Sequence, residues 1–209
     1  MSSLEEPGGA AGAGLERAVA ALLAGEAVVV PTDTVYGVAT ATAVPGSTAT
    51  LFRLKRRPVD VALPVLCADE EQARALAGAL PAAASALMAA CWPGPLTLVV
   101  PRRSGLDLDL GGPDDGTIGL RVPDAPIVRA IAGRVGPLAC TSANRHGHPT
   151  PVTAAEAAAA LGPGVGTVVD GGRCEGLPST VVGWVGSELR VLRHGSLTVD
   201  DLAAVLHPR

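Results

Sequence analysis

The sequence has little of several residue types and motifs, and each shortage excludes a class of protein. Its four cysteines are scattered along the chain, without the paired spacing that builds zinc sites or redox centres. It lacks a dinucleotide fingerprint, a glycine-rich loop ending in Lys-Ser or Lys-Thr, a nucleophile elbow and a kinase signature. We therefore predict no structural metal. If the protein binds phosphate, we expect side chains rather than a glycine-rich loop to hold it. We also predict buried free thiols at Cys67, Cys91, Cys140 and Cys174.

Charged residues are scarce as well, at 17% of the chain, and none occurs between Arg74 and Arg102. That gap is long enough to cross a bilayer, but much of it is alanine and three prolines cut it into short pieces. Glu5 and Glu6 stand where a secretory signal peptide needs positive charge. We therefore expect no membrane association and a cytoplasmic protein. The three prolines are Pro81, Pro93 and Pro95.

No sustained period runs through the sequence, which excludes collagen, coiled-coil and repeat architectures. Of the 209 residues, 48% are apolar, which is enough for one sizeable buried core. Residues 1–14 are rich in glycine, alanine and serine, and this composition predicts a flexible tail. Residues 15–209 are then expected to form a single domain.

Apolar spacing and turn residues predict strands and helices in irregular alternation. Strands are expected at 27–30, 63–67, 96–101, 117–122, 138–140, 165–170, 180–184 and 189–192. Helices are expected at 15–23, 47–56, 69–80, 82–91 and 126–134, after Thr153 with Glu156 at the capping-box position, and from Thr198 and Asp200 to Leu206. This mixture favours an α/β fold of the α+β type, with a twisted mixed β-sheet flanked by helices.

Basic residues are almost all arginine, and Lys55 is the only lysine in the chain. It lies in the dense basic run 53–57 of a protein whose net charge is -4. Such a run at a helix end either complements the helix dipole in solvent or binds an anion such as phosphate. The only asparagine, Asn144, and the only tyrosine, Tyr36, also lie in polar segments beside apolar ones.

Polar side chains gather where several predicted strands begin or end. Each has a plain structural alternative, because serine, threonine and asparagine often only stabilise turns, and Asp33 is either a base or a cap of local amides. Together they are typical of a pocket at a sheet edge. The candidates are Thr32, Asp33, Thr34, Ser142, Asn144, Ser179 and Arg193.

These segments form an ordered series of motifs that closely resembles the YrdC-like threonylcarbamoyl-AMP synthase family. The chain resembles the short, single-domain form, and the match covers about residues 15–206. The motifs are Pro31-Thr-Asp-Thr-Val-Tyr-Gly37, Lys55-Arg-Arg-Pro58, Trp92-Pro-Gly-Pro-Leu-Thr97, Arg121-Val-Pro123, Ser142-Ala-Asn144, Pro178-Ser-Thr-Val181 and Leu192-Arg-His-Gly195.

The resemblance implies a nucleotidyltransferase that makes threonylcarbamoyl-AMP and pyrophosphate from L-threonine, bicarbonate or CO2, and ATP. The threonine amine is carboxylated, and the new carboxylate then attacks the α-phosphate. Mg2+ is expected to bind through the phosphates of ATP rather than to a protein cage. The product serves threonylcarbamoyl-adenosine modification of tRNA, so a downstream threonylcarbamoyl-transferase complex and a weak or transient tRNA contact are the expected partners.

The resemblance also assigns roles to individual residues. Thr34, Arg121 and Ser179 match the threonine contacts, and Arg121 suits bidentate capture of the amino acid carboxylate. Lys55 and Arg57 match the residues expected to be catalytic, because they neutralise charge on the triphosphate. Tyr36 either lines the pocket or packs in the core. The full set of expected ATP contacts is Lys55, Arg57, Ser142, Asn144 and Arg193.

The chain departs from the family pattern at three positions. Val61 and Ala62 stand where a polar or basic residue and a proline are common, and Gly183 stands where aspartate is frequent. Three alternatives to the synthase therefore stay open. One is a carbamoyl-adenylate module of hydrogenase maturation, although its zinc-finger and acylphosphatase-like segments are absent from this sequence. The others are a degenerate threonine- or ATP-sensing protein and an RNA-binding module, which the net charge of -4 disfavours.

Overall fold

The computed structural model describes residues 8–56, 61–108, 110–145, 147–174, 176–186 and 188–208. Its helices are α1 (Gly8–Leu23), α2 (Ser47–Lys55), α3 (Glu70–Leu76), α4 (Ala82–Cys91), α5 (Pro126–Val135), α6 (Ala154–Leu161) and α7 (Val199–Leu206), with a 3-10 turn, η1, at Gly162–Gly164. Its strands are β1 (Val28–Val30), β2 (Gly37–Ala41), β3 (Val65–Leu66), β4 (Leu96–Pro101), β5 (Thr117–Arg121), β6 (Leu138–Ser142), β7 (Thr167–Val168), β8 (Thr180–Val185) and β9 (Glu188–Arg193).

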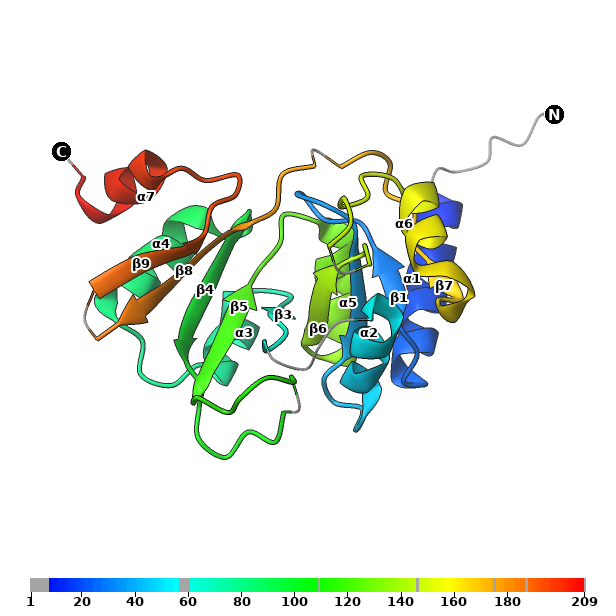
Figure 1. Cartoon of the computed structure of the whole chain (residues 1–209), viewed down its shortest axis with the longest axis horizontal. Coiled ribbons are helices and arrows are strands. Elements are labelled where there is room, and N and C mark those ends of the chain that lie inside the picture. Colours follow the sequence, from blue (N-terminus) through cyan, green and yellow to red (C-terminus); the bar gives the residue numbers. More distant parts are fainter. Residues whose placement is uncertain are drawn as a thin grey trace.

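All these strands belong to one mixed sheet that runs across the molecule (Figure 1), in the order β7-β1-β2-β6-β3-β5-β4-β8-β9. The pairs β1·β7, β3·β5 and β4·β8 are parallel, and the other neighbouring pairs are antiparallel. The prediction of a mixed sheet flanked by helices is confirmed.

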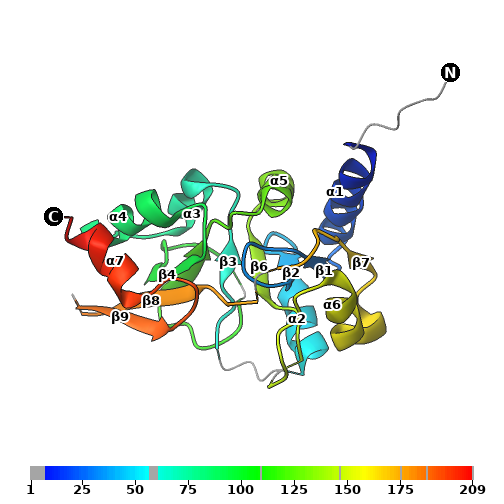
Figure 2. The ribbon, with the colours of Figure 1, turned by 90° about the horizontal axis from the view of Figure 1, so that it is seen from above.

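Two apolar clusters hold the helices against the sheet. In β1, Val28 and Val30 belong to one cluster and Val29 to the other, because alternate side chains of a strand point to opposite faces. Helices α1 and α5 pack on the first cluster, and α2, α3, α4, α6 and α7 contribute to the second. Figure 2 shows α1 and α5 on one side of β1 and β2, with α2 and α6 on the other.

Side chains fix the starts of three helices. Asp69 accepts a hydrogen bond from the Gln72 amide at α3, and Thr153 accepts one from the Glu156 amide at α6. Thr198 forms a reciprocal capping box with Asp201 at α7. These caps satisfy amides that have no partner inside the helix. The predicted cap at Thr153 is confirmed, and so is the start of the last helix at Thr198.

Several predicted boundaries are wrong. The first helix begins at Gly8, so residues 8–14 belong to α1 rather than to a tail, and residues 1–7 lie outside the described residues. The strands expected at 63–67 and 165–170 are shorter in the structure, as β3 (Val65–Leu66) and β7 (Thr167–Val168). The helix expected at 69–80 ends at Leu76. A strand extends only as far as its backbone pairs with a neighbouring strand. The apolar runs at β3 and β7 are longer than these paired stretches.

Strand β2 was not predicted from the sequence at all. Its small residues Gly37, Ala39 and Ala41 have weak strand propensity, yet every residue of β2 is buried between β1 and β6. The cysteines also differ in part from expectation. All four are free, but Cys91 and Cys174 are only half-buried, whereas Cys67 and Cys140 are buried.

Candidate active site

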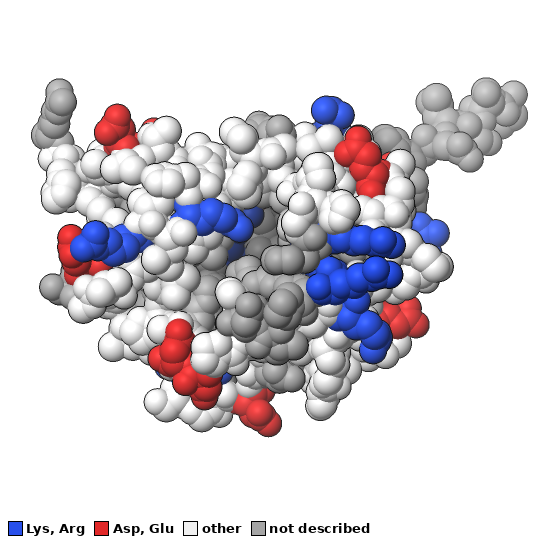
Figure 3. Space-filling model, in the orientation of Figure 1, with Lys and Arg blue, Asp and Glu red and all other residues white. Residues whose placement is uncertain are grey.

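A cavity of about 760 Å3 lies against the sheet, and it is lined by residues of β2, β6, β3, β5, β4, β8 and β9, which are neighbours in that order. Figure 3 shows a recess in this face of the molecule, with Lys and Arg side chains on either side of it. Of the eight residues to which the resemblance assigns a role, seven line the same cavity, and Arg57 lies outside the described residues. The seven are Thr34, Lys55, Arg121, Ser142, Asn144, Ser179 and Arg193. Of the two further candidates, Thr32 also lines the cavity and Asp33 does not.

The Lys55 ammonium is held at one end of the cavity. Lys55 is the last residue of α2 and only 4% of it is exposed. Its Nζ donates to the carbonyl of Ser142, to Ser142 Oγ at 3.1 Å and to Asn144 Oδ1 at 3.0 Å. Ser142 Oγ also donates to Asn144 Oδ1 at 2.6 Å. A buried ammonium needs acceptors for its protons, and the end of β6 supplies them.

The Arg121 guanidinium is anchored at the opposite end. Its Nε donates to the Gly94 carbonyl at 3.0 Å, Nη1 to Thr34 Oγ1 at 3.0 Å and Nη2 to Asp33 Oδ1 at 2.6 Å. The side chains of Arg121 and Asp33 are 6% and 14% exposed. Asp33 Oδ2 is buried and has no hydrogen-bond partner within the described ranges. Asp33 therefore acts as counter-ion and anchor of Arg121.

The turn that carries Thr34 is stabilised by its own hydroxyl groups. Thr32 Oγ1 accepts the amides of Thr34 and Val35 at 3.2 and 3.1 Å and donates to the Val35 carbonyl at 2.6 Å. The predicted hydroxyl-stabilised turn is therefore present. It holds Asp33 and Thr34 just after the carboxyl end of β1, where both contact Arg121.

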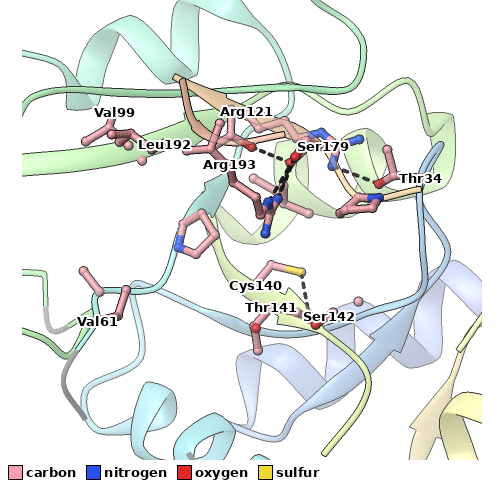
Figure 4. A pocket seen from close by; sticks show the side chains of 18 of the residues that line it. Thr34, Val61, Val99, Arg121, Cys140, Thr141, Ser142, Ser179, Leu192 and Arg193 are labelled. Atoms are coloured by element: carbon pink, nitrogen blue, oxygen red, sulfur yellow. Dashed lines mark hydrogen bonds between the residues drawn. The ribbon is translucent and has the colours of Figure 1, made fainter. Parts of the chain in front are cut away.

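Arg193 and Ser179 lie beside Arg121 (Figure 4), and Thr97 joins them through the Ser179 hydroxyl. Arg193 donates to the Ser179 carbonyl from Nε at 3.1 Å and from Nη2 at 2.8 Å, and Nη2 also donates to Ser179 Oγ at 2.9 Å. Thr97 Oγ1 lies 2.8 Å from Ser179 Oγ. Burial, and then repulsion from Arg121, lower the pKa of Arg193, which nevertheless stays charged at neutral pH.

Thr97 is a site residue that sequence reasoning missed. It ends the Trp92-Pro-Gly-Pro-Leu-Thr97 motif, to which the resemblance assigns no substrate contact. The signal was its place in β4, where Leu96 and Leu98 are fully buried. Because strand side chains alternate between faces, Thr97 points to the opposite face, into the cavity.

Cys140 lines the cavity in β6, between the Lys55 and Arg121 ends. Burial raises the pKa of its thiol to about 12, although the nearby charges of Arg121 and Lys55 act in the opposite direction. The group is therefore a neutral thiol at physiological pH. A protonated thiol is a poor nucleophile, so Cys140 shapes the cavity floor rather than reacting.

Tyr36 packs in the core and is absent from the cavity lining. Its hydroxyl lies within donating distance of the Gly172 carbonyl at 2.7 Å and of Asp170 Oδ1 at 3.3 Å, and it accepts the Gly171 amide at 3.1 Å. Burial raises the pKa of Tyr36. Of the two roles considered for it, packing is the one observed.

Of the three departures from the family pattern, two lie in the cavity lining and the third lies behind it. Val61 and Ala62 line the cavity directly. At Gly183, an added Cβ would lie 2.9 Å from Leu192 Cδ1 and 3.3 Å from Val99 Cβ, so the missing side chain leaves room for these two wall residues. Figure 4 shows Val99 and Leu192 side by side, away from Thr34 and Ser142.

The described ranges contain no cluster of three or more His, Cys, Asp or Glu side chains that could hold a metal ion. Within the same ranges, no helix is long and apolar enough to cross a membrane. The cavity instead offers Lys55, Arg121 and Arg193 together with several hydroxyl groups. This chemistry suits oxyanions such as carboxylates and phosphates.

Comparison with known proteins agrees with this fold and cavity. The family model Sua5_yciO_yrdC, described as "Telomere recombination", matches residues 20–195. A putative threonylcarbamoyl-AMP synthase of Mycobacterium tuberculosis is 39% identical, over 92% of this chain and 89% of that protein. The threonylcarbamoyl-AMP synthase of Bacillus subtilis is 34% identical, over 93% of this chain and 57% of that protein.

Among solved structures, Pyrococcus abyssi Sua5 complexed with L-threonine superposes with a TM-score of 0.86 and 31% identity. The match covers 92% of this chain and 57% of that one. The chain thus spans little more than half the length of the Bacillus and Pyrococcus proteins. Since the family model covers most of the sequence, from strand β1 to strand β9, the chain belongs to the Sua5/YciO/YrdC family.

Proposed function

We propose that the protein is an L-threonylcarbamoyladenylate synthase. It combines L-threonine, bicarbonate or CO2, and ATP to give threonylcarbamoyl-AMP and pyrophosphate. The observation that carries this proposal is one cavity with two anion-binding ends, Arg121 with Thr34 and Lys55 with Ser142. The names of the curated relatives support the same activity.

The Arg121 end is the proposed threonine site. Arg121 binds the amino acid carboxylate, since each Nη atom keeps an N–H beyond its bond to Thr34 or Asp33. Thr34 and Ser179 supply hydroxyl groups beside it. Because Asp33 and Thr34 already hold the guanidinium in place, the substrate carboxylate binds to a group that is ordered before it arrives.

The Lys55 end is the proposed triphosphate site, with Ser142 and Asn144 as further contacts and Arg57 as an expected one. Arg193, which lies beside Arg121 in the same cavity, is the proposed ATP contact from the other side. The ammonium and guanidinium groups neutralise charge that moves onto the leaving pyrophosphate. We expect Mg2+ to enter as its complex with ATP, because a hard cation prefers phosphate oxygens. Bound to ATP, Mg2+ would lower the net negative charge of the triphosphate beside Lys55.

The reaction needs no protein nucleophile. The threonine amine attacks CO2, loses a proton and becomes a carbamate, whose oxygen then attacks the α-phosphorus of ATP and expels pyrophosphate. The protein aligns these groups and excludes water from them. The mixed anhydride it makes is the donor for threonylcarbamoyl-adenosine in tRNA, so we expect a downstream transferase complex, a transient tRNA contact and a cytoplasmic location.

The test is release of pyrophosphate by the purified chain with ATP, Mg2+ and bicarbonate, with and without L-threonine. We expect threonine-dependent release in the wild type and in Arg190→Ala, whose exposed side chain forms an ion pair with Glu188 away from the cavity lining. In Lys55→Met, release should fall at least about tenfold, because a charge-assisted contact to phosphate is lost. Binding of threonine and ATP without any release indicates a sensing protein and contradicts the proposal.

A further inference from the structure

The turn at residues 92–95 does not line the cavity, yet it lies directly behind the threonine end. Strands β4 and β5 pair antiparallel, so the turn that precedes β4 lies opposite the residues that end β5. The buried Gly94 donates its amide to the Val122 carbonyl at 2.9 Å, and its own carbonyl accepts Arg121 Nε at 3.0 Å. Any effect of Gly94 on a substrate therefore passes through Arg121.

The turn that carries this carbonyl is tied to its neighbours on both sides. The Trp92 amide donates to the Met88 carbonyl of α4 at 3.0 Å. The Pro95 carbonyl accepts the amide of Thr180, the first residue of β8, at 2.9 Å. Because both flanks of the turn are held in this way, the carbonyl between them has one fixed direction, towards the guanidinium.

Position 94 has no room for a side chain. A Cβ built on Gly94 would lie 2.5 Å from the carbonyl oxygen of Cys91, which is much closer than van der Waals contact allows. Cys91 is the last residue of α4, so its carbonyl is held by the end of a helix that packs on the core. Alanine at position 94 would therefore shift the turn and move its carbonyl relative to Arg121.

The Gly94 contact decides which edge of the Arg121 guanidinium faces the cavity. A guanidinium has five N–H groups, one on Nε and two on each terminal nitrogen. Gly94 accepts the single Nε proton, while Thr34 accepts one proton from Nη1 and Asp33 one from Nη2. Figure 4 shows the Nη1 bond to Thr34. The two N–H groups that remain for a carboxylate therefore belong to Nη1 and Nη2.

We propose that Gly94 is a positioning residue for the threonine site, because its carbonyl holds Arg121 Nε and leaves the Nη1 and Nη2 edge to bind the L-threonine carboxylate. This inference rests on the proposed function and deepens it. Without the Gly94 bond, Thr34 and Asp33 hold the guanidinium from one side only. It can then pivot, and substrate binding must order it again. Ordering one long side chain weakens affinity by about two- to tenfold.

The first measurement is NMR of the isotope-labelled wild type, in which the Nε–H resonance of Arg121 is identified by its loss in Arg121→Lys. This proton should exchange with solvent about tenfold or more slower than the Nε–H of Arg190, whose side chain is 57% exposed. It should do so with and without L-threonine, because Gly94 holds it in both states. Exchange as fast as in Arg190, or protection that requires L-threonine, would overturn the inference.

The second measurement compares Gly94→Ala with the wild type. The Kd for L-threonine from calorimetry, and its KM in the pyrophosphate assay, should rise about two- to tenfold. The kcat and the KM for ATP should change less than about twofold, because the triphosphate end is intact. The Arg121 Nε–H should exchange faster with solvent than in the wild type, which a loss of stability elsewhere in the fold would not produce by itself.

Gly78→Ala is the matched control. A Cβ at Gly78 would also press on a backbone carbonyl oxygen, that of Arg102 at 3.2 Å, but Gly78 does not line the cavity. Whatever its effect on Tm, this variant should keep the wild-type KM for L-threonine and the protected Arg121 Nε–H. If it raises that KM as much as Gly94→Ala does, the effect is a general loss of rigidity and the positioning role is wrong.

The outcomes keep the two claims apart. A wild type with threonine-dependent release, together with a folded Gly94→Ala variant of unchanged affinity for L-threonine, overturns the positioning role alone. An unprotected Arg121 Nε–H in the wild type does the same, even if Gly94→Ala does not fold. A wild type that neither binds L-threonine nor releases pyrophosphate with it overturns the proposed function, and this inference with it.

Discussion

The Arg121–Asp33 ion pair gives the sharpest prediction about stability. In the wild type the Asp33 side chain is 14% exposed and its Oδ1 lies 2.6 Å from the Arg121 guanidinium, and Arg121→Ala leaves this carboxylate without its counter-ion. Removing one partner of a buried pair costs about 3–5 kcal/mol. Because Asp33 keeps some contact with solvent, we expect the lower end, about 3 kcal/mol.

This loss is large enough to measure by thermal unfolding. For a chain of this size, each kcal/mol moves the Tm by about 2–4 °C, so Arg121→Ala should unfold about 6–12 °C below the wild type. In Asp33→Asn/Arg121→Ala no buried charge remains unpaired, and a large part of that loss should be recovered. The double-mutant cycle then reports the coupling of the two residues.

Two results would refute the reasoning. If Arg121→Ala unfolds within about 2 °C of the wild type, Asp33 is not held as a buried charge by this contact. If the double variant is no more stable than Arg121→Ala, the lost contacts of Arg121 with Gly94 and Thr34 account for the destabilisation instead. The role of Arg121 in binding is tested separately by calorimetry, which measures the affinity of Arg121→Lys for L-threonine. This variant keeps the positive charge but loses the paired N–H donors of the guanidinium.

Two further predictions concern the cavity floor. The raised pKa of Cys140, about 12, leaves the thiol protonated below that pH, so iodoacetamide should label it slowly at pH 7 and about tenfold faster for each pH unit above that; mass spectrometry after trypsin digestion measures this, and rapid labelling at pH 7 would contradict it. Gly37→Ala places a Cβ 2.7 Å from Cys140 Sγ and should cost about 1–3 kcal/mol by overpacking. Urea unfolding of Gly37→Ala with and without Cys140→Ala checks this, since the smaller side chain should relieve the loss.

The sequence allowed the sheet class and most helices to be predicted because their signals are local. The cap of α6 at Thr153 and the start of α5 at a proline need only neighbouring residues. The cavity was predicted for a similar reason. Polar residues that follow buried strands meet at a sheet edge, and Ser142, at the end of β6, does lie beside Lys55.

The features that were missed depend on distant parts of the chain. Strand β2 exists because β1 and β6 give its small residues ladder partners on both sides, and no local pattern shows that. The early start of α1 overrides four glycines in 8–14, since its later turns pack on α5. Thr97 and Ser179 are 82 residues apart, so their shared bond is visible only after folding.

The cationic side chains of the cavity are already hydrogen-bonded to protein oxygens before any substrate binds. Arg121 and Arg193 each donate to oxygens of the protein, and Lys55 donates to Ser142 and Asn144. An incoming carboxylate or phosphate therefore replaces or shares existing bonds, and the net gain per contact is the difference between two charge-assisted bonds. Preorganisation offsets this smaller gain, because the side chains are already ordered when the substrate binds. Affinity for each substrate should consequently be moderate, and specificity should depend on where the donors and acceptors of the cavity are held rather than on total positive charge.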